Sequence, residues 1–150
     1  MGNSKLRVGD RIPEFELLNQ NEEKVSISPS DGKRRIIYFY PKDDTKVCTE
    51  QACSFRDWQT ELTEKGYEVI GISSDSPTAH LKFQSNHNLN FILLSDPNGE
   101  VQKLFGAKKF FGLIPARKTF LINEEGKIEF EYDAFFEGEE HIEQLKKHIN

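Results

Sequence analysis

The sequence predicts an α/β protein in which a central mixed β-sheet is flanked by helices. Over residues 35–105, apolar β-rich segments alternate with segments whose apolar residues recur every three or four positions, the spacing of an amphipathic helix. Two further β-rich segments then follow one another directly, and this succession indicates an antiparallel pair. Parallel strand–helix units followed by an antiparallel pair make a mixed sheet.

The first strands are expected at 14–18 and 24–28, joined by a polar segment, as an N-terminal hairpin. A continuous apolar run at 35–40 predicts a strand buried on both faces, and this strand ends at Pro41. A helix is expected at 48–64 because apolar residues are spaced three, three and four apart there. Its apolar stripe consists of Ala52, Phe55, Trp58 and Leu62.

Strands and helices continue to alternate until the final hairpin. The expected later elements are strands at 67–73 and 91–95, helices at 78–86 and 100–105, a hairpin of strands at 117–123 and 127–133, and a last helix at 138–148. This order of elements is that of a thioredoxin-like fold with an added N-terminal hairpin.

The bulk properties exclude several classes of function. The chain has 150 residues, 36% of them hydrophobic, and a net charge of -5, so we expect one domain over residues 1–150. An acidic chain without a clustered basic patch argues against nucleic-acid binding. The N-terminus has no apolar leader and the apolar runs are too short to cross a bilayer, so we expect a cytosolic protein that does not bind membranes.

The chain has only two cysteines, Cys48 and Cys53, both in the stretch 40-YPKDDTKVCTEQACSFRDW-58. In a reducing compartment a cysteine pair is more often catalytic or redox-active than a structural crosslink. Cys48 follows the strand at 35–40, and open α/β sheets place active groups beyond the carboxyl ends of their strands. Cys48 is therefore the candidate nucleophile. An inert thiol at Cys48 and an ordinary core residue at Cys53 are the alternatives.

A nucleophilic thiol at Cys48 needs groups that stabilise its negative charge. The free N–H groups of a helix start supply part of this stabilisation, and a guanidinium supplies more. Arg117, at the start of a later strand, is expected to face Cys48 across the sheet, whereas Arg56 points about two turns further along the helix. Thr45 is the expected N-cap, with its hydroxyl directed at the N–H of residue 48. Pro41 fixes the preceding loop.

The spacing of the two cysteines excludes a disulfide within an intact helix. Residues five apart in an ideal helix have Cα atoms about 8.7 Å apart, whereas a disulfide needs Cα atoms within about 7 Å. Any redox cycle between Cys48 and Cys53 therefore has to unwind the first turns of the helix.

The remaining ionisable residues are expected to be structural. Adjacent Asp43 and Asp44 could form a carboxylate pair for acid–base chemistry, but we expect them to form a solvated cap before the helix. The alternative to a contact between Arg117 and Cys48 is an ordinary ion pair of Arg117 at the protein surface. The scattered histidines have no zinc-ligand spacing and are expected at the surface. They are His80, His87, His141 and His148.

The run 41-PKDDTKVC-48 resembles the Pro-x-x-x-Thr-x-x-Cys signature of the peroxiredoxins. Together with 49-TEQACSFRD-57 it is similar to the peroxiredoxin Q group, also called bacterioferritin comigratory proteins. The resemblance covers almost the whole chain, because further segments are similar to the family's blocks in the same order. These segments are 7–17, 36–45, 67–77, 91–96 and 117–122.

The resemblance implies a thiol peroxidase that needs no metal or organic cofactor. Cys48 would be the peroxidatic cysteine, which attacks hydrogen peroxide or an organic hydroperoxide and becomes a sulfenic acid. Arg117 and Thr45 would hold the thiolate and the peroxide oxygens, and Pro41 would shape the pocket. Cys53 would resolve the sulfenic acid as an intramolecular disulfide, which thioredoxin or a similar dithiol would reduce. An intramolecular pair also favours a monomer.

The sequence departs from the group's pattern at two places near Cys48. Lys46-Val47 stands where the Q group usually has Pro-Gly, and without the proline ring this turn is expected to unwind more easily. Position 51 is Gln, where the family often has Glu. Near Arg117, the apolar Phe110, Phe111, Leu113 and Ile114 are either core residues or a lining that favours organic peroxides.

Two other functions compete with the peroxidase. A thioredoxin-fold disulfide reductase or oxidase would use the same two thiols, although dithiol exchange works best when the thiols are held close. A non-catalytic binding or sensor module would use Cys48 only to report oxidation, without turnover.

Overall fold

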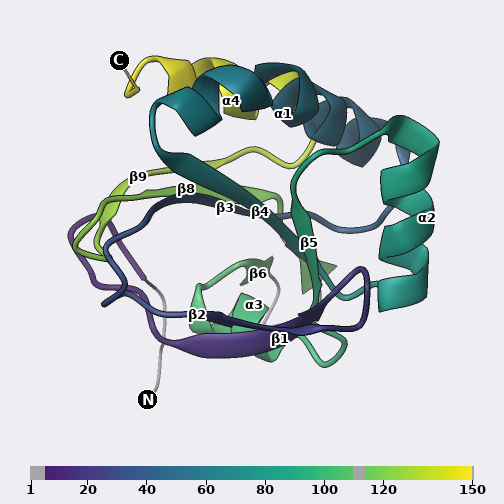
Figure 1. Ribbon diagram of the computed structural model, residues 1–150, viewed down its shortest axis with the longest axis horizontal. Helices are drawn as coiled ribbons and strands as arrows, with labels where there is room; N and C mark the ends of the chain where they lie inside the picture. Colours follow the sequence, from purple (N-terminus) through teal and green to yellow (C-terminus); the bar gives the residue numbers. More distant parts are fainter. Residues whose placement is uncertain (1–5, 110–113, 150) are drawn as a thin grey trace.

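A computed structural model of the chain describes residues 6–109 and 114–149 (Figure 1). The predicted strands and helices occur in the predicted order. They are β1 (Phe15–Asn19), β2 (Lys24–Ile27), β3 (Arg34–Phe39), α1 (Lys46–Glu64), β4 (Tyr67–Ser73), α2 (Pro77–His87), β5 (Ile92–Ser95), α3 (Glu100–Leu104), β6 (Lys108–Lys109), β7 (Ile114–Pro115), β8 (Lys118–Ile122), β9 (Ile128–Asp133) and α4 (Glu139–Lys146).

A seven-stranded mixed sheet forms the centre of the molecule, in the order β2-β1-β5-β4-β3-β8-β9. Strands β3, β4 and β5 are parallel, and β8 and β9 continue the sheet as antiparallel strands. The hairpin of β1 and β2 joins the other side, where β1 pairs antiparallel with β5. The mixed sheet and the added N-terminal hairpin are therefore both confirmed.

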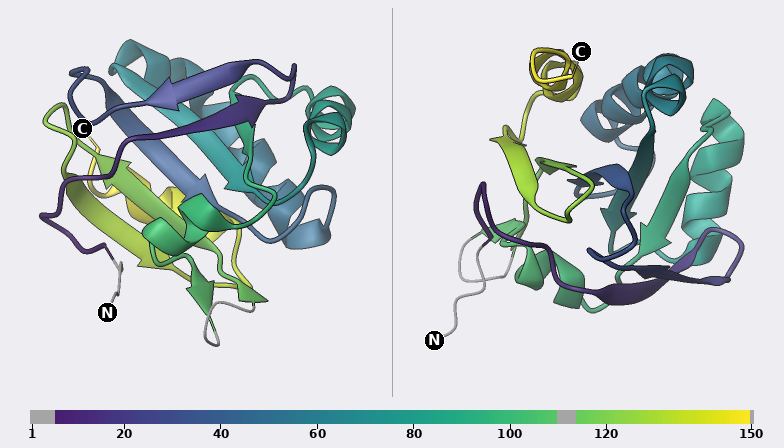
Figure 2. Two further views of the ribbon diagram at one scale, coloured as in Figure 1. Left: turned by 90° about the horizontal axis from the view of Figure 1, so that it is seen from below. Right: turned by 60° about the vertical axis from the view of Figure 1, so that its left-hand side comes forward.

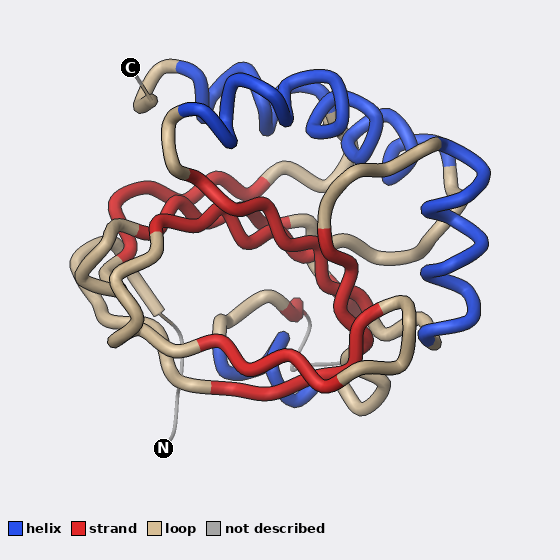
Figure 3. Tube along the Cα trace, in the orientation of Figure 1, coloured by secondary structure: helices blue, strands red, loops and turns tan. Residues whose placement is uncertain are grey.

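Helices cover both faces of this sheet (Figures 1 and 3). Figure 2 shows α1 and α4 side by side on one face, and the two helices are in contact. The short helix α3 lies on the opposite face, where the sheet curls towards β1 and β2. One buried cluster fills the space under α1, with Phe55, Trp58 and Leu62 packed on Tyr38 and Val69. A second cluster under α3 is built around Phe39, Phe105 and Phe120.

The strand register brings three distant segments to one end of the sheet. Phe39, the last residue of β3, pairs with Lys118, the first residue of the antiparallel β8. Lys118 in turn pairs with Asp133, the last residue of β9. The loop before α1, the residues that precede β8 and the segment between β9 and α4 therefore meet where β3 ends.

The region after α3 holds a small feature that the sequence did not predict. Lys108–Lys109 pairs antiparallel with Ile114–Pro115 as a separate two-stranded ribbon. The apolar residues expected near Arg117 lie partly in the intervening segment 110–113, outside the described residues. Among the described residues, no helix has the length and apolarity needed to cross a bilayer.

Candidate active site

Cys48 lies in the first turn of α1 and is 1% exposed. The helix begins at Lys46 with Thr45 as its N-cap residue, close to the predicted start. Cys48 faces inward because it continues the apolar stripe of Ala52 and Phe55, which lie four and seven residues further along. Because Cys48 lies on the apolar face of the helix, its thiol is placed at the end of the sheet.

Arg117 contacts Cys48 directly. Its Nη2 donates a hydrogen bond to Cys48 Sγ at 3.1 Å, and its own side chain is buried with 2% exposure. The other two nitrogens are also held: Nη1 donates to Gln51 Oε1 at 2.8 Å, and Nε donates to the Phe135 carbonyl at 2.7 Å. Three fixed hydrogen bonds define the orientation of a planar guanidinium, which a lysine ammonium would not reproduce.

The electrostatics of this arrangement favour a negative charge on sulfur. A guanidinium next to a thiol favours the thiolate, and burial strengthens their attraction by excluding water. The partner of Arg117 on α1 is the neutral amide of Gln51, so the positive charge remains available to Cys48. From the sequence, Gln51 was noted only as a departure from the family's pattern, and its contact with Arg117 was not predicted. Its position three residues after Cys48, on the same helix face, is the signal that predicts this contact.

The hydroxyl of Thr45 does not make the contact that the sequence predicted. It donates to the Lys42 carbonyl at 2.8 Å instead of capping the helix, and no side chain of the described residues caps the first turn. The chain turns at residues 43–44, where Asp44 adopts a left-handed conformation with φ of 61°, and the Thr45 hydroxyl bonds across this turn. The first N–H groups of α1, beside Cys48, therefore lack a side-chain acceptor. Pro41 lies half-buried at the end of β3.

Cys53 lies one and a half turns further along the same helix. Both cysteines are free thiols within the intact α1, as expected for the reduced protein. Cys53 is half-buried, and the buried cluster that contains Cys48 does not include it. Arg56 is directed away from the site, because its Nη1 donates to the His87 carbonyl at 2.7 Å.

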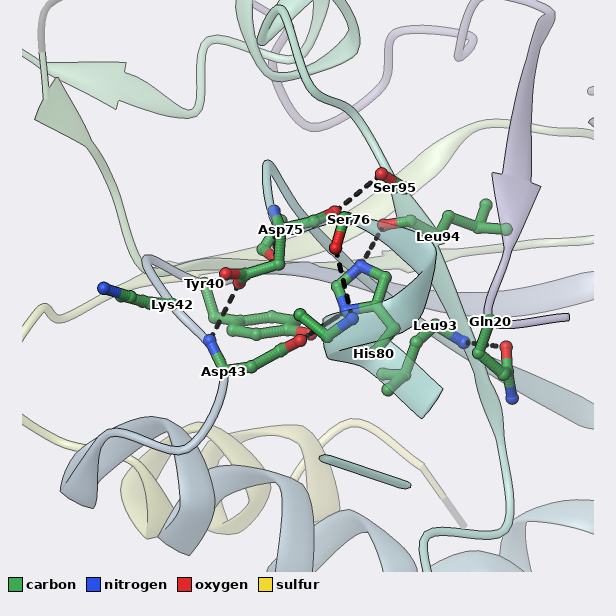
Figure 4. A network of polar contacts seen from close by, with 12 residues as sticks. Gln20, Tyr40, Lys42, Asp43, Asp75, Ser76, His80, Leu93, Leu94 and Ser95 are labelled. Carbon is green, nitrogen blue, oxygen red and sulfur yellow. Dashed lines mark hydrogen bonds and ion pairs between the residues drawn. The ribbon is translucent and has the colours of Figure 1, made fainter. Parts of the chain in front are cut away.

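A second polar cluster lies under the loop that leads into α1, and it corrects the expectation of a solvated acidic cap (Figure 4). Asp43 is 8% exposed. Its carboxylate accepts hydrogen bonds from Tyr40 Oη at 2.5 Å and from His80 Nδ1 at 2.6 Å. Its backbone N–H donates to Asp75 Oδ2 at 2.8 Å. Asp44 is the more exposed of the two acids and pairs with His87 at 3.0 Å.

The buried side chains of this cluster bond one another and the backbone of β5. His80 has no exposed surface, and its Nε2 donates to the Leu94 carbonyl at 3.0 Å while Nδ1 faces the Asp43 carboxylate. Burial, followed by the charge of Asp43, raises the pKa of Tyr40 well above its usual range, so this hydroxyl stays a donor. Asp43, Asp75 and His80 have potential metal-ligand atoms within 4.8 Å of one another. However, Asp43 Oδ2 and His80 Nδ1 bond each other.

The expectation of four surface histidines is wrong for two of them. His80 and His141 are completely buried, whereas His87 is half-buried and His148 is exposed. The buried pair was missed because their partners come from other elements. His80 pairs with a residue 37 positions away, and His141 bonds Thr119, which lies 22 positions away. Local sequence patterns do not report such contacts.

Comparison with known proteins agrees with the geometry. Residues 8–131 match the model of the AhpC/TSA family. Peroxiredoxin Q of Sedum lineare is 39% identical over 145 residues, which cover 96% of this chain and 78% of that protein. Peroxiredoxin Q of Populus jackii is 37% identical over 96% of this chain and 68% of that protein. The crystal structure of a peroxidoxin from Mycobacterium tuberculosis superposes with a TM-score of 0.85, 31% identity and 93% coverage of both chains.

These relatives also correct the expectation of a cytosolic protein. Those from Populus jackii, Sedum lineare, Gentiana triflora and Arabidopsis thaliana are all named as chloroplastic proteins. The prediction rested on the absence of an apolar leader, which speaks only against the secretory route. It is therefore contradicted, and we withdraw it.

The structural likeness confirms the thioredoxin-like fold that the order of elements predicted. The match to the family model covers most of the chain, and the curated relatives carry the same enzyme name. Among the three functions that the sequence left open, these relatives support the peroxidase. The chain therefore belongs to the AhpC/TSA family and, within it, to the peroxiredoxin Q group of thiol peroxidases.

Proposed function

We propose that the chain is a two-cysteine peroxidase, with Cys48 as peroxidatic and Cys53 as resolving cysteine, that reduces hydrogen peroxide and organic hydroperoxides in antioxidant defence. The observation that carries this proposal is the 3.1 Å contact between Arg117 Nη2 and Cys48 Sγ in a buried site. A thiolate is the nucleophilic form of cysteine, and an adjacent guanidinium favours it.

In the first step, the Cys48 thiolate attacks the terminal oxygen of the hydroperoxide. An S–O bond forms as the O–O bond breaks, so sulfur is oxidised to a sulfenic acid and the peroxide is reduced. The leaving oxygen takes up a proton and departs as water or an alcohol. Arg117 stabilises the negative charge that develops on the two peroxide oxygens.

The loop before Cys48 completes the oxygen-binding groups. The N–H groups at the start of α1 have no side-chain cap, so they are available to a peroxide oxygen next to the thiol. We assign Thr45 a second hydrogen bond to that oxygen, since its hydroxyl also has lone pairs that accept. Pro41, half-buried at the end of β3, shapes the loop and limits the entry of water.

In the second step, the Cys53 thiolate attacks the sulfenic sulfur of Cys48. The S–S bond forms as the S–O bond breaks, and the hydroxide takes up a proton and leaves as water. Cα atoms five residues apart in a helix are about 8.7 Å apart, beyond the roughly 7 Å that a disulfide tolerates. The first turns of α1 therefore unwind before the bond forms.

A dithiol such as thioredoxin closes the cycle. It transfers two electrons and two protons to the Cys48–Cys53 disulfide and is itself oxidised to a disulfide. We assign the protein a monomeric state, because both thiols of the cycle belong to one helix. We also assign residues 1–150 to one domain, since a single sheet links strands from β1 to β9.

The proposal is tested by mixing the reduced protein with one equivalent of hydrogen peroxide. Trp58, the only tryptophan, lies in α1 and reports the unwinding through its fluorescence. We expect a fast change in fluorescence and a loss of about two mass units, mapped to Cys48 and Cys53 and reversed by thioredoxin.

Two variants control this experiment. Cys48→Ser should abolish peroxide consumption, and a variant that still turns over would disprove the assignment of the peroxidatic cysteine. Arg56→Ala removes a cation of the same helix that bonds the His87 carbonyl instead of Cys48, and it should react with peroxide at close to the wild-type rate.

A further inference from the structure

His141 is a buried histidine on α4 that has no contact with Cys48 in the proposed reaction. Its Nε2 donates to the Ala134 carbonyl at 2.9 Å, because a carbonyl oxygen only accepts. Its Nδ1 lies 2.8 Å from Thr119 Oγ1 and accepts a hydrogen bond from that hydroxyl. The ring has no exposed surface. The neutral ring with its proton on Nε2 therefore satisfies every polar atom in this contact.

The carbonyl that His141 holds belongs to the segment that also holds Arg117. The Phe135 carbonyl, one residue after Ala134, accepts the hydrogen bond from Arg117 Nε at 2.7 Å. The N–H of Ala134 donates to the Arg117 carbonyl at 3.3 Å. The Phe135 ring also lies 5.7 Å from the guanidinium carbon. One short segment is thus fixed by His141 on one side and bonded to Arg117 on the other.

We infer that His141 is a positioning residue for the peroxidase reaction. It holds the Ala134 carbonyl, thereby fixes the Phe135 carbonyl, and so directs the guanidinium of Arg117 at Cys48. This inference rests on the proposed role of Arg117. Two hydrogen bonds connect His141 to the guanidinium, one to the Ala134 carbonyl and one from Arg117 to the Phe135 carbonyl. His141 itself does not contact the substrate.

The surroundings of His141 support this role. Burial, with the nearby charge of Arg117 adding to it, lowers the pKa of His141 to about 4, so the ring is neutral near pH 7. The hydrogen bond to the Ala134 carbonyl opposes this shift, and so do the charges of Asp133, at the end of β9, and Glu137. The ring of Tyr132 lies nearly perpendicular to the imidazole, with the two ring centroids 4.8 Å apart. A proton on Nδ1 would add a cation beside Arg117 and displace the hydrogen bond from Thr119.

The test compares two substitutions of His141 in the full-length reduced protein. In His141→Gln, the amide nitrogen can donate to Ala134 and the amide oxygen can accept from Thr119, so the rate of oxidation by hydrogen peroxide should stay close to wild type. His141→Leu fills similar space without either bond. We expect its rate to fall by about tenfold to a hundredfold, the effect of a small misplacement of a reacting group. Glu143→Ala, on the exposed side of α4, is the control.

The pH dependence separates positioning from simple packing. The ratio of wild-type to His141→Gln rates cancels every effect of pH that the two proteins share. We expect this ratio to be constant near neutral pH and to fall as the pH approaches about 4, where only the wild type gains a proton on the ring. If His141→Leu fails to fold, His141→Gln still decides the inference, because a rate far below wild type in this variant contradicts it.

The inference is overturned if His141→Leu reacts as fast as wild type, or if His141→Gln, which keeps both hydrogen bonds, reacts as slowly as His141→Leu. Arg117→Ala distinguishes these results from a failure of the proposed function. If Arg117→Ala is slow while His141→Leu is fast, only the role of His141 is wrong. If Arg117→Ala itself reacts at the wild-type rate, the assignment of Arg117 is wrong as well.

Discussion

Arg117 Nη2 lies 3.1 Å from Cys48 Sγ although 69 residues separate them in the chain. The contact exists because β8 runs antiparallel to β3, so that the residue before β8 meets the helix that follows β3. Gln51 and the Phe135 carbonyl bind the remaining nitrogens of the guanidinium. The orientation of the charge is therefore as well defined as its distance from the thiol.

Replacing Arg117 with lysine tests whether this orientation matters beyond the charge. Arg117→Lys keeps a cation but cannot bond Cys48, Gln51 and Phe135 together. A hydrogen bond to a charged group contributes about 1.5–3 kcal/mol, so we expect the second-order rate with peroxide to fall by about tenfold to a hundredfold. Stopped-flow fluorescence measures this rate. A lysine variant as fast as wild type would show that charge alone is sufficient.

Cys53→Ser should separate the two steps of the cycle. The contact between Cys48 and Arg117 does not involve Cys53, so the first oxidation should proceed at close to the wild-type rate. The sulfenic acid at Cys48 should then persist, because the resolving thiol is missing. Labelling with dimedone and intact mass detects it. Formation of a disulfide between two chains in this variant would instead show that resolution is intermolecular.

Gly138 limits how closely the segment after β9 can pack on α1. A Cβ at this position would lie 2.6 Å from the Val47 carbonyl and 3.0 Å from the Gln51 nitrogen, which are backbone atoms of the first turns. Gly138→Ala should therefore push the segment away from α1 and slow the reaction with peroxide by about tenfold or more. Steady-state kinetics measures this effect. The neighbouring Glu139→Ala, at an exposed position, should leave the rate unchanged.

The two adjacent acids of the loop should differ strongly in their effect on stability. Asp43→Asn places an amide between the donors Tyr40 and His80, and breaking a buried pair in this way costs about 3 kcal/mol. Asp44→Asn changes a more exposed pair with His87 and should cost less than about 1 kcal/mol. Urea unfolding measures both free energies. Equal effects would refute the structural role assigned to Asp43.

Stability should rise with pH between about 4 and 6.5 because of His141. Its pKa is about 4 in the folded chain and 6.5 as the ordinary value. In this interval the unfolded chain binds a proton that the folded chain does not, so lowering the pH favours unfolding. The full effect is about 3 kcal/mol, at 1.36 kcal/mol per unit of pKa. The difference in unfolding free energy between wild type and His141→Gln isolates it. A difference that does not vary with pH would contradict the buried neutral ring.

The parts of the fold that depend on local pattern were predictable. The buried run of β3 and the apolar stripe of α1 follow directly from residue spacing, which is why the sheet and its main helix were expected where they occur. The start of α1 at Lys46 agrees with Thr45 as the expected N-cap, although the periodic spacing alone indicated a helix only from residue 48. The ribbon of β6 and β7 has strands of two residues, too short for a pattern to show.

The site was predictable only where helix geometry or family resemblance pointed to it. Cys48 was predicted because it lies at the start of a helix, and Arg117 because it begins a strand expected to face Cys48, a role that the resemblance also implied. The predicted Thr45 contact was wrong because its hydroxyl bonds the Lys42 carbonyl across the turn at residues 43–44, and the residue types do not specify that turn. The buried pair of Asp43 and His80 was missed because charged residues are usually exposed, and only the packing of α2 on β5 brings the two together.

The long separation between Cys48 and its arginine has a consequence for the newly made chain. The thiol leaves the ribosome well before Arg117, and later still come the Phe135 carbonyl and Gly138, which close the site. Until these residues are synthesised and folded, Cys48 has no guanidinium beside it and is an ordinary cysteine. Reactivity towards peroxide is therefore acquired only after residues 117–138 have been synthesised and have folded against α1.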